Sequence, residues 1–308
     1  MSYKLLSTTI AIALLSGMAS AWAADLVEPA YEELPQPAYQ PVSTSGWYLR
    51  GDVGFVFKNK TSGDWDFYNQ FPGVEGIDDT YNYHTFTLAK AASFGGGVGY
   101  RFTDQLRSDL TLDYFKTDVE GQTPCPFMVQ IDPNGLNLPY DARCDLKGST
   151  SVSVWTAMAN AYVDIGQFGR VNPYLGAGIG LAHVSYDDYS EDQVCGAPYS
   201  CPFSGNHEGK ESWRFAGSLM AGATIDLTQN LKLDAGYRYT RIQGGDAYGF
   251  DGPDTSFGAV GVQGRDHGFD VHTVRAGLRY EFGGGPQDVS YAASPSYSSP
   301  VSVEPAYR

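Results

Sequence analysis

Residues 270–282 alternate between two kinds of side chain. From Val274 onward, apolar or small residues occupy one parity, and polar residues or glycine occupy the other. Because successive side chains of a strand point to opposite faces, this pattern predicts a strand with one apolar face, ending in aromatics, and one charged face. Such a strand suits a wall with hydrocarbon on one side and a wet or ion-paired interior on the other.

The same alternation recurs in seven other segments, residues 47–57, 86–102, 106–115, 152–165, 171–184, 213–227 and 231–242. Short connections (103–105, 166–170, 228–230) alternate with long ones (58–85, 118–151, 185–212, 243–269). The pattern predicts an all-β fold over residues 46–282: an eight-stranded antiparallel up-and-down transmembrane β-barrel with short periplasmic turns and four long extracellular loops. A soluble β-sandwich is the alternative, but it would bury its apolar face and show no such asymmetry of connections.

Residues 1–23 have the features of a signal peptide, with Lys4, an apolar run at 5–15 and Ala-Trp-Ala at 21–23. Residues 24–45 read as a Pro/Glu-rich linker and residues 283–308 as a Pro/Ser/Tyr-rich tail. An even number of strands would place both in the periplasm. Val-Glu-Pro-Ala-Tyr occurs at 27–31 and again at 303–307, which reflects either shared linker composition or a common partner.

Composition supports a membrane barrel and excludes other classes. No segment after the signal peptide approaches the ~20 consecutive apolar residues that a membrane helix needs. The 22 Tyr and 37 Gly suit aromatic belts and small interior positions. A net charge of −15 argues against nucleic acid, which requires a basic face.

Charged residues collect on the inward parity of the predicted strands. Eight strands leave an interior just wide enough for side chains to fill, so these charges should pair. This indicates a plugged lumen, with a narrow pore as the alternative. The predicted lumen ion-pair residues are Arg50, Asp52, Arg101, Arg107, Asp109, Asp113, Arg214, Asp226, Lys232, Asp234, Arg238, Arg275, Arg279 and Glu281.

The four cysteines are Cys125, Cys144, Cys195 and Cys201. Export makes disulfides plausible, and four cysteines allow three connectivities. Of these, the local pairs Cys125–Cys144 and Cys195–Cys201 are the simplest. Zinc competes, with His207 as the nearby histidine, but no close Cys-x-x-Cys spacing supports it.

Acidic residues concentrate in the predicted loops, where a solvated surface is the simplest interpretation and loose binding of divalent cations near lipopolysaccharide the alternative. Ser185 shares an outward face with His183, and Glu191 follows, as in some barrels that trim lipid A. A nucleophilic serine needs a base within hydrogen-bond reach and a third group that orients this base. Because the acid is not at the expected spacing, we predict no catalytic residues and no enzyme. We also predict no metal or cofactor residues, since no calcium-loop pattern is present.

Four stretches, residues 21–26, 173–180, 231–241 and 274–282, carry a family resemblance. The chain resembles the small eight-stranded outer-membrane proteins of alphaproteobacteria, related in architecture to the OmpA membrane domain and OmpX. The likeness covers residues 46–282. It implies insertion by the barrel assembly machinery, whose usual signal is a final aromatic; here Phe282 is followed by a tail. It also implies that Ala24, preceding Asp25, is the site of covalent attachment to peptidoglycan by an LD-transpeptidase.

The sequence thus predicts a structural protein of the Gram-negative outer membrane, in contact with lipid and lipopolysaccharide. It would support envelope integrity and present acidic loops at the surface. A narrow porin, a surface protein that binds haem or a host molecule, and a lipid A-modifying enzyme are the alternatives.

Overall fold

The computed structural model describes residues 45–131, 136–139, 141–201 and 203–282. These residues fall within one compact unit. The predicted signal peptide, the tail, Ala24 and Asp25, and all of the linker except Ser45 lie outside the described residues. No helix in the described ranges is long and apolar enough to cross a membrane.

The described residues form a fourteen-stranded antiparallel sheet and two short helices, α1 (Phe127–Ile131) and α2 (Gly252–Ser256). The strands are β1 (Gly46–Val56), β2 (Asn59–Thr61), β3 (Gly63–Asn69), β4 (Gly76–Asn82), β5 (Thr85–Leu88), β6 (Ala91–Arg101), β7 (Leu106–Pro124), β8 (Cys144–Asp164), β9 (Val171–Tyr186), β10 (Tyr189–Cys195), β11 (Ser204–Gly209), β12 (Glu211–Asp226), β13 (Leu231–Asp251) and β14 (Val262–Glu281).

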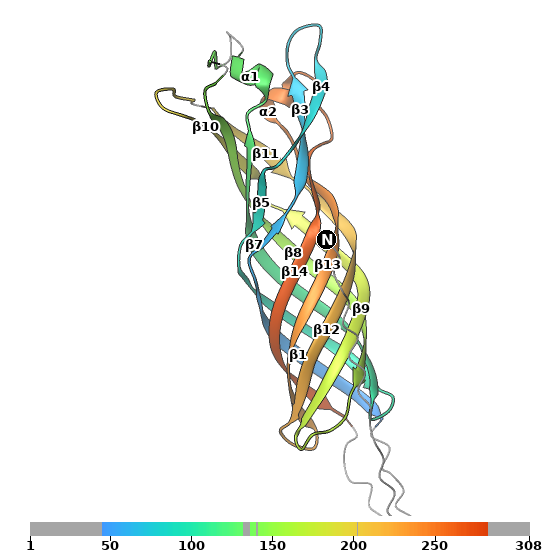
Figure 1. Ribbon diagram of the computed structural model, residues 1–308. Helices are drawn as coiled ribbons and strands as arrows, with labels where there is room; N and C mark the ends of the chain where they lie inside the picture. The colour runs from blue at the N-terminus through green and yellow to red at the C-terminus, as the bar shows by residue number, and fades with distance from the viewer. Residues whose placement is uncertain (1–44, 132–135, 140, 202, 283–308) are drawn as a thin grey trace, which may run out of the picture. The chain divides into compact units, whose positions relative to one another are not determined.

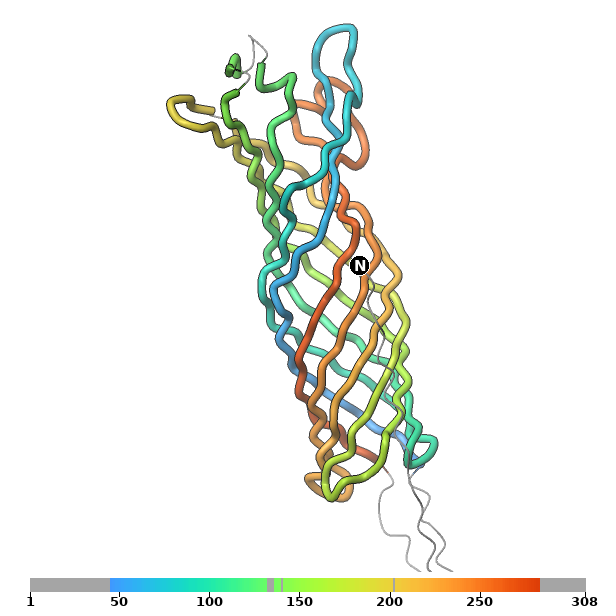
Figure 2. Tube along the Cα trace, in the orientation of Figure 1, coloured from blue at the N-terminus to red at the C-terminus, as the bar shows by residue number. Residues whose placement is uncertain are grey.

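The long strands close into a barrel. Starting at β1, neighbours pair in the order β6, β7, β8, β9, β12, β13 and β14. β14 also pairs with β1, so this sequence of pairings returns to its start. Figures 1 and 2 show these strands winding around a common interior, which we call the lumen. The prediction of an all-β, antiparallel outer-membrane barrel fold agrees with this arrangement.

The alternation of faces is as the sequence predicts. Along β1, Tyr48, Arg50 and Asp52 are buried in the lumen. Trp47, Leu49 and Val53 are more than half exposed on the outside. An apolar outer surface of this extent is unfavourable in water and favourable in hydrocarbon.

Two belts of aromatic side chains bound this apolar surface. The first, the lower girdle, lies beside the short turns and contains Trp47, Tyr100, Phe102, Tyr280 and Phe282. The second, the upper girdle, contains Phe55, Phe57, Tyr114, Trp155, Trp213, Tyr237 and Tyr239. From Trp47 to Phe57 the strand covers about 33 Å, which at a ~40° tilt spans roughly 25 Å, the height of the apolar band in outer-membrane barrels.

The segments predicted as loops are largely β-structured, which the sequence did not reveal. β7, β8, β13 and β14 continue beyond the upper girdle, and β10 joins β8 while β11 joins β13. β3 and β4 extend the wall from β14. Loop composition, rich in Asp, Gly and Pro, hides these strands, because their pairing depends on the long strands that they extend. The predicted strand 86–102 is also divided, into β5 and β6.

Candidate functional site: a filled lumen and a loop-end pocket

The middle of the lumen holds a continuous ion-pair network. Arg50 contacts Asp52 at 2.8 Å and Asp109 at 3.0 Å. Asp52 also pairs with Arg275 at 2.5 Å. Asp113 completes the chain, at 3.7 Å from Arg275 and 2.6 Å from Arg238. The charges of these six residues cancel.

A second network lies toward the short turns. Arg101 and Arg279 both contact Glu281, at 2.5 and 3.2 Å. Arg279 also lies 3.6 Å from Asp234. Lys232 contacts Asp226 at 2.5 Å and Glu281 at 3.9 Å. This network is balanced as well, and Arg279 is fully buried.

Two acids that the sequence analysis missed complete the pairing. Arg107, fully buried, contacts Asp164 at 3.2 Å, and Arg214 contacts Asp266 at 2.7 Å. Asp164 has the same parity as the inward residues of its strand and could have been found. Asp266 could not, because the inward parity of β14 changes at Gly268, whose φ is +95°.

Aromatic side chains fill the space between the charges. The Arg107 guanidinium lies 4.3 Å from the centre of the Tyr162 ring and 4.7 Å from that of Tyr174, a cation–π arrangement. Glycines on facing strands make room for these rings; a Cβ on Gly99 would overlap the Tyr48 ring. The alternation of glycine and tyrosine on the inward parity therefore packs the lumen.

Above the two charged networks the lumen becomes largely apolar, apart from the Arg214–Asp266 ion pair beside Phe269. A layer of buried side chains crosses it at the height of the upper girdle and beyond, including Val56, Phe115, Val154, Val184, Ile242, Phe269 and Val271. A cavity where this layer meets the charged network measures about 40 Å³, which is room for one or two waters. The sequence predicts an ion-paired lumen, and its pattern does not reveal this layer.

The four cysteines form two disulfides, Cys125–Cys144 and Cys195–Cys201. Cys144 and Cys195 are also direct neighbours in the pairing of β8 with β10. The sulfurs of Cys144, Cys195 and Cys201 lie within 4.8 Å of one another, which is close enough to share a metal ion. Each of them is already bonded in a disulfide, and the described part of the chain holds no free cysteine. The two bridges tie together the wall beyond the upper girdle.

The outward pair His183 and Ser185 meets a different acid from the one predicted. Glu211, on the neighbouring strand β12, lies 3.4 Å from His183 Nε2. Ser185 Oγ donates to the other oxygen of the same carboxylate at 3.3 Å. Glu191 instead lines a pocket at the loop end. The serine is thus bonded to the acid, whereas a nucleophilic serine needs a bond to the base.

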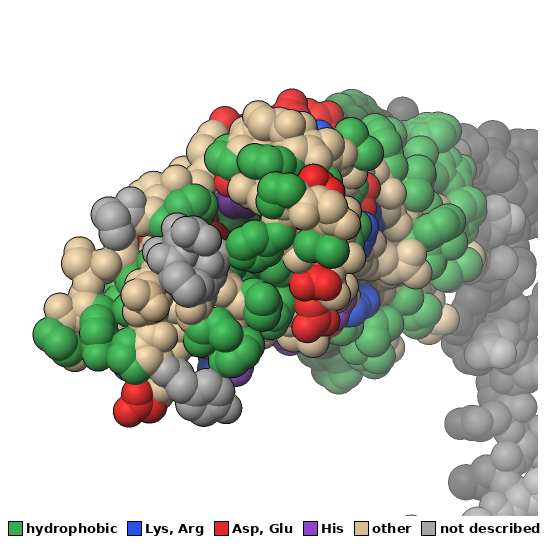
Figure 3. Space-filling view, turned by 90° about the horizontal axis from the view of Figure 1, so that it is seen from above, with side chains coloured by type: hydrophobic (Ala, Val, Ile, Leu, Met, Phe, Trp, Pro, Cys, Tyr) green, Lys and Arg blue, Asp and Glu red, His purple; other side chains and the backbone are tan. Residues whose placement is uncertain are grey.

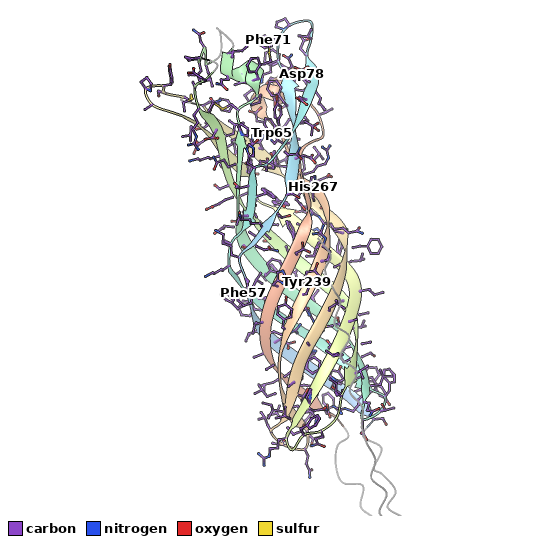
Figure 4. The ribbon with its side chains drawn as sticks, viewed as in Figure 1. Phe57, Trp65, Phe71, Asp78, Tyr239 and His267 are labelled. Carbon is purple, nitrogen blue, oxygen red and sulfur yellow. A yellow bond between two sulfur atoms is a disulfide. The ribbon has the colours of Figure 1, made fainter. Side chains whose placement is uncertain are left out.

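That pocket, the loop-end pocket, is a cavity of about 490 Å³ beyond the upper girdle. All four predicted loop segments contribute to it. Its aromatic walls are formed by Trp65, Phe67, Tyr68, Phe71, Phe203 and Phe257, with aliphatic residues between them, and its polar residues include Glu191, His207, Asp251, Asp254 and Gln263. Figure 4 places Trp65 on β3 within the loop end, with Phe71 farther out. The alternating Trp-Asp-Phe at 65–67, inside a predicted acidic loop, was the available signal.

Burial perturbs the titratable groups of the loop-end pocket. Desolvation, with help from Asp251 and Asp192, raises the pKa of Glu191 to about 7. Desolvation also raises the pKa of Asp254 to about 6, with Asp251 adding to the effect. It lowers the pKa of His207. The pocket is therefore a desolvated environment with an excess of carboxyl groups.

The closed sheet, the apolar belt between two girdles and the paired interior define a β-barrel protein of the outer membrane. Comparison with known proteins agrees: the family described as outer membrane protein beta-barrel domain matches residues 9–282, and the chain belongs to it. An uncharacterised protein of Brucella melitensis is 51% identical over 280 residues, covering 87% of this chain and 95% of that protein.

More distant relatives belong to other bacteria. The outer membrane protein PagN of Salmonella typhimurium is 30% identical over 54% of this chain and 67% of its own. A putative adhesin of Rickettsia conorii is 27% identical over 76% of this chain and 82% of its own. Among solved structures, OprG of Pseudomonas aeruginosa covers 78% of this chain and 97% of its own at 17% identity, with a TM-score of 0.45.

Proposed function

We propose that this protein is a sealed, eight-stranded outer-membrane barrel that carries a β-structured, disulfide-tied extension at the cell surface. The filled lumen is the observation that carries the proposal. Each lumen cation described above has a carboxylate partner, and an apolar layer lies beyond the two charged networks. Isolated buried charges are costly, so paired ones resist the rearrangement that an open pore would need.

We place the loop end outside the cell and the short-turn end in the periplasm. The Phe282 backbone N–H donates to the Trp47 carbonyl at the short-turn end. The first and last described residues of the chain therefore both lie at this end. Disulfides in the extension suit an oxidising exterior. Hydrophobic and acidic side chains are prominent on the loop end in Figure 3. Lipid would contact the apolar belt and lipopolysaccharide the surface above it.

Planar-bilayer recording of the full mature chain tests the seal. We expect no channel steps after insertion, with a known porin as the positive control and a heat-dependent gel mobility shift as proof of folding. Reproducible single-channel steps from the folded protein would refute the sealed lumen and favour the narrow porin. Protease treatment of whole cells tests the orientation, because cleavage should fall only in the extension.

Attachment to peptidoglycan through Ala24 is a separate proposal, supported by the Ala24-Asp25 start and the extended linker. Digestion of sacculi with muramidase should release a muropeptide joined to the peptide that begins at Ala24. A free amino terminus on every copy would rule it out. We also propose that the protein is not an enzyme, so expression should leave lipid A mass unchanged, with Ser185→Ala as the control variant.

Binding of a host or small molecule at the surface is the second candidate. The Rickettsia relatives are described as putative adhesins. The rim of the loop-end pocket exposes Phe71, Phe203 and Phe257 to solvent, and exposed aromatic patches often mark interaction sites. Haem fits this pocket poorly, because its two propionates would face an acidic lining.

A further inference from the structure

The loop-end pocket combines aromatic walls with uncompensated acids. Glu191 and Asp251 line it, and no lysine or arginine occurs among its lining residues. Within the described part of the chain, neither acid takes part in an ion pair. One Asp251 oxygen is used locally, accepting from the Asp254 amide at the start of α2. The Glu191 carboxylate accepts no such hydrogen bond from the described residues.

Three buried polar atoms of the pocket lack hydrogen-bond partners among the described residues: the Trp65 indole N–H, the Gln263 side-chain oxygen and His207 Nδ1. Trp65 and Gln263 are only 7% and 4% exposed. The orientation of the Gln263 amide is fixed, since its nitrogen donates to the Asp66 carbonyl at 3.2 Å and to Asp254 at 3.4 Å. Buried polar groups are rarely left unpaired, so the Trp65 donor awaits a ligand or water, and the Gln263 oxygen, which lies beside the His207 ring, can accept from a ligand.

We propose that the loop-end pocket binds a small organic cation, an ammonium group carried on an apolar body that also holds a hydrogen-bond acceptor. The ammonium pairs with Glu191 and Asp251 and donates to the Gln263 oxygen. The apolar body packs on Trp65 and Phe67, whose ring faces attract cations. The acceptor takes the free Trp65 N–H.

Size favours a small molecule over a docked protein surface. A cavity of about 490 Å³ is within the range of small-molecule sites, and its lining combines aromatic and aliphatic side chains with polar groups. The proposal does not depend on the conductance or orientation of the barrel, because binding can be measured on folded protein in detergent.

Three probe molecules of similar shape test whether the loop-end pocket selects a positive charge. Tyramine carries an ammonium, tyrosol a neutral hydroxyl and 4-hydroxyphenylacetate a carboxylate, and all three hold a phenol. Isothermal titration of the folded full mature chain at pH 8 should show saturable binding of tyramine. Tyrosol should bind about tenfold more weakly or worse, because it lacks the charge-assisted contacts, and the anion should not bind measurably. Equal binding of all three, or no saturable binding of tyramine, would overturn the proposal.

Two matched variants locate the site. Glu191→Gln removes a carboxylate at constant size and should weaken tyramine about tenfold or more. Glu208→Gln makes the same change on an exposed side chain of β11 and should leave binding as it is. Trp65→Phe keeps a ring, loses the N–H and should weaken tyramine more than phenethylamine, which has no acceptor. Equal losses for Glu191→Gln and Glu208→Gln would place binding elsewhere. The gel mobility shift confirms the folding of each variant. If a variant does not fold, the comparison of tyramine, tyrosol and 4-hydroxyphenylacetate on the unmodified protein still tests the proposal.

Discussion

Asp109 offers the sharpest test of the filled lumen. It is 4% exposed, and its two oxygens accept four hydrogen bonds. Arg50 Nη1 and the Tyr48 hydroxyl approach one oxygen at 3.0 and 3.2 Å. Asn160 and the Tyr162 hydroxyl approach the other at 2.7 and 3.3 Å. Asp109→Ala would remove the acceptor of two tyrosine hydroxyls and one asparagine amide, and one of the two carboxylates that contact Arg50.

The loss of stability caused by Asp109→Ala depends on whether the lumen is dry and packed or filled with water. In a dry, packed interior, removing one member of a buried ion pair destabilises by about 3–5 kcal/mol. Here Arg50 would keep Asp52, but the network would hold three arginines against two carboxylates. In a water-filled channel the same pair would be screened and its loss would cost about 0–1 kcal/mol. Asp109→Asn should fall between Asp109→Ala and the unmodified protein, since it keeps an acceptor oxygen and loses the charge.

Unfolding in urea from phospholipid vesicles, followed by tryptophan fluorescence and gel mobility, measures the difference in free energy. The double variant Arg50→Met with Asp109→Leu should lose less stability than the sum of the single changes, by about 1–3 kcal/mol. Asp187→Asn, which alters an exposed ion pair with Lys116, is the control and should change nothing measurable. A loss below about 1 kcal/mol for Asp109→Ala would refute the packed lumen.

Three further outcomes are expected. Gly99→Val should destabilise by about 1–3 kcal/mol or prevent folding, because its side chain would overlap Tyr48, whereas Gly51→Ala, which faces open space, should be neutral in the same urea titration. Tyramine affinity should rise between pH 6 and pH 8 as Glu191, whose pKa is raised to about 7 by burial and by Asp251 and Asp192, becomes charged. His207 and Asp254 also face the pocket, so Glu191→Gln must flatten this rise for the assignment to stand. Reduction of the disulfides should speed protease cleavage in the extension and leave the heat-dependent mobility of the barrel unchanged; loss of that mobility shift would mean that the bridges support the barrel itself.

The periodicity of the chain predicts the barrel wall because a two-residue period has an immediate physical meaning when one face meets lipid. Along β1, and along β12 from Phe215 to Ala221, each predicted outward residue is less buried than its inward neighbours. The prediction fails where the period is interrupted. The change of parity at Gly268 on β14 hid Asp266, the partner of Arg214.

The loop-end pocket could not be predicted from the sequence, for a different reason. Glu191, Trp65 and Gln263 come from three different predicted loops, and nothing local in the sequence shows that these loops meet. Their approach depends on strands that lengthen the wall beyond the membrane, such as β10 and β11, which have little alternation of their own. The acid beside His183 could not be identified for the same reason, since Glu211 reaches it across a strand pair.

The apolar layer connects the two proposals. It consists of buried side chains such as Phe115 and Ile242 that offer a cation no partner, and the carboxylate of Asp266 beside it is already paired with Arg214 at 2.7 Å. Moving an ammonium group through it would cost far more than holding the group at Glu191, because an unpaired charge in an apolar environment is strongly unfavourable. If both proposals hold, we expect a ligand that enters the loop-end pocket to leave by the same mouth, so that the protein binds it without transporting it.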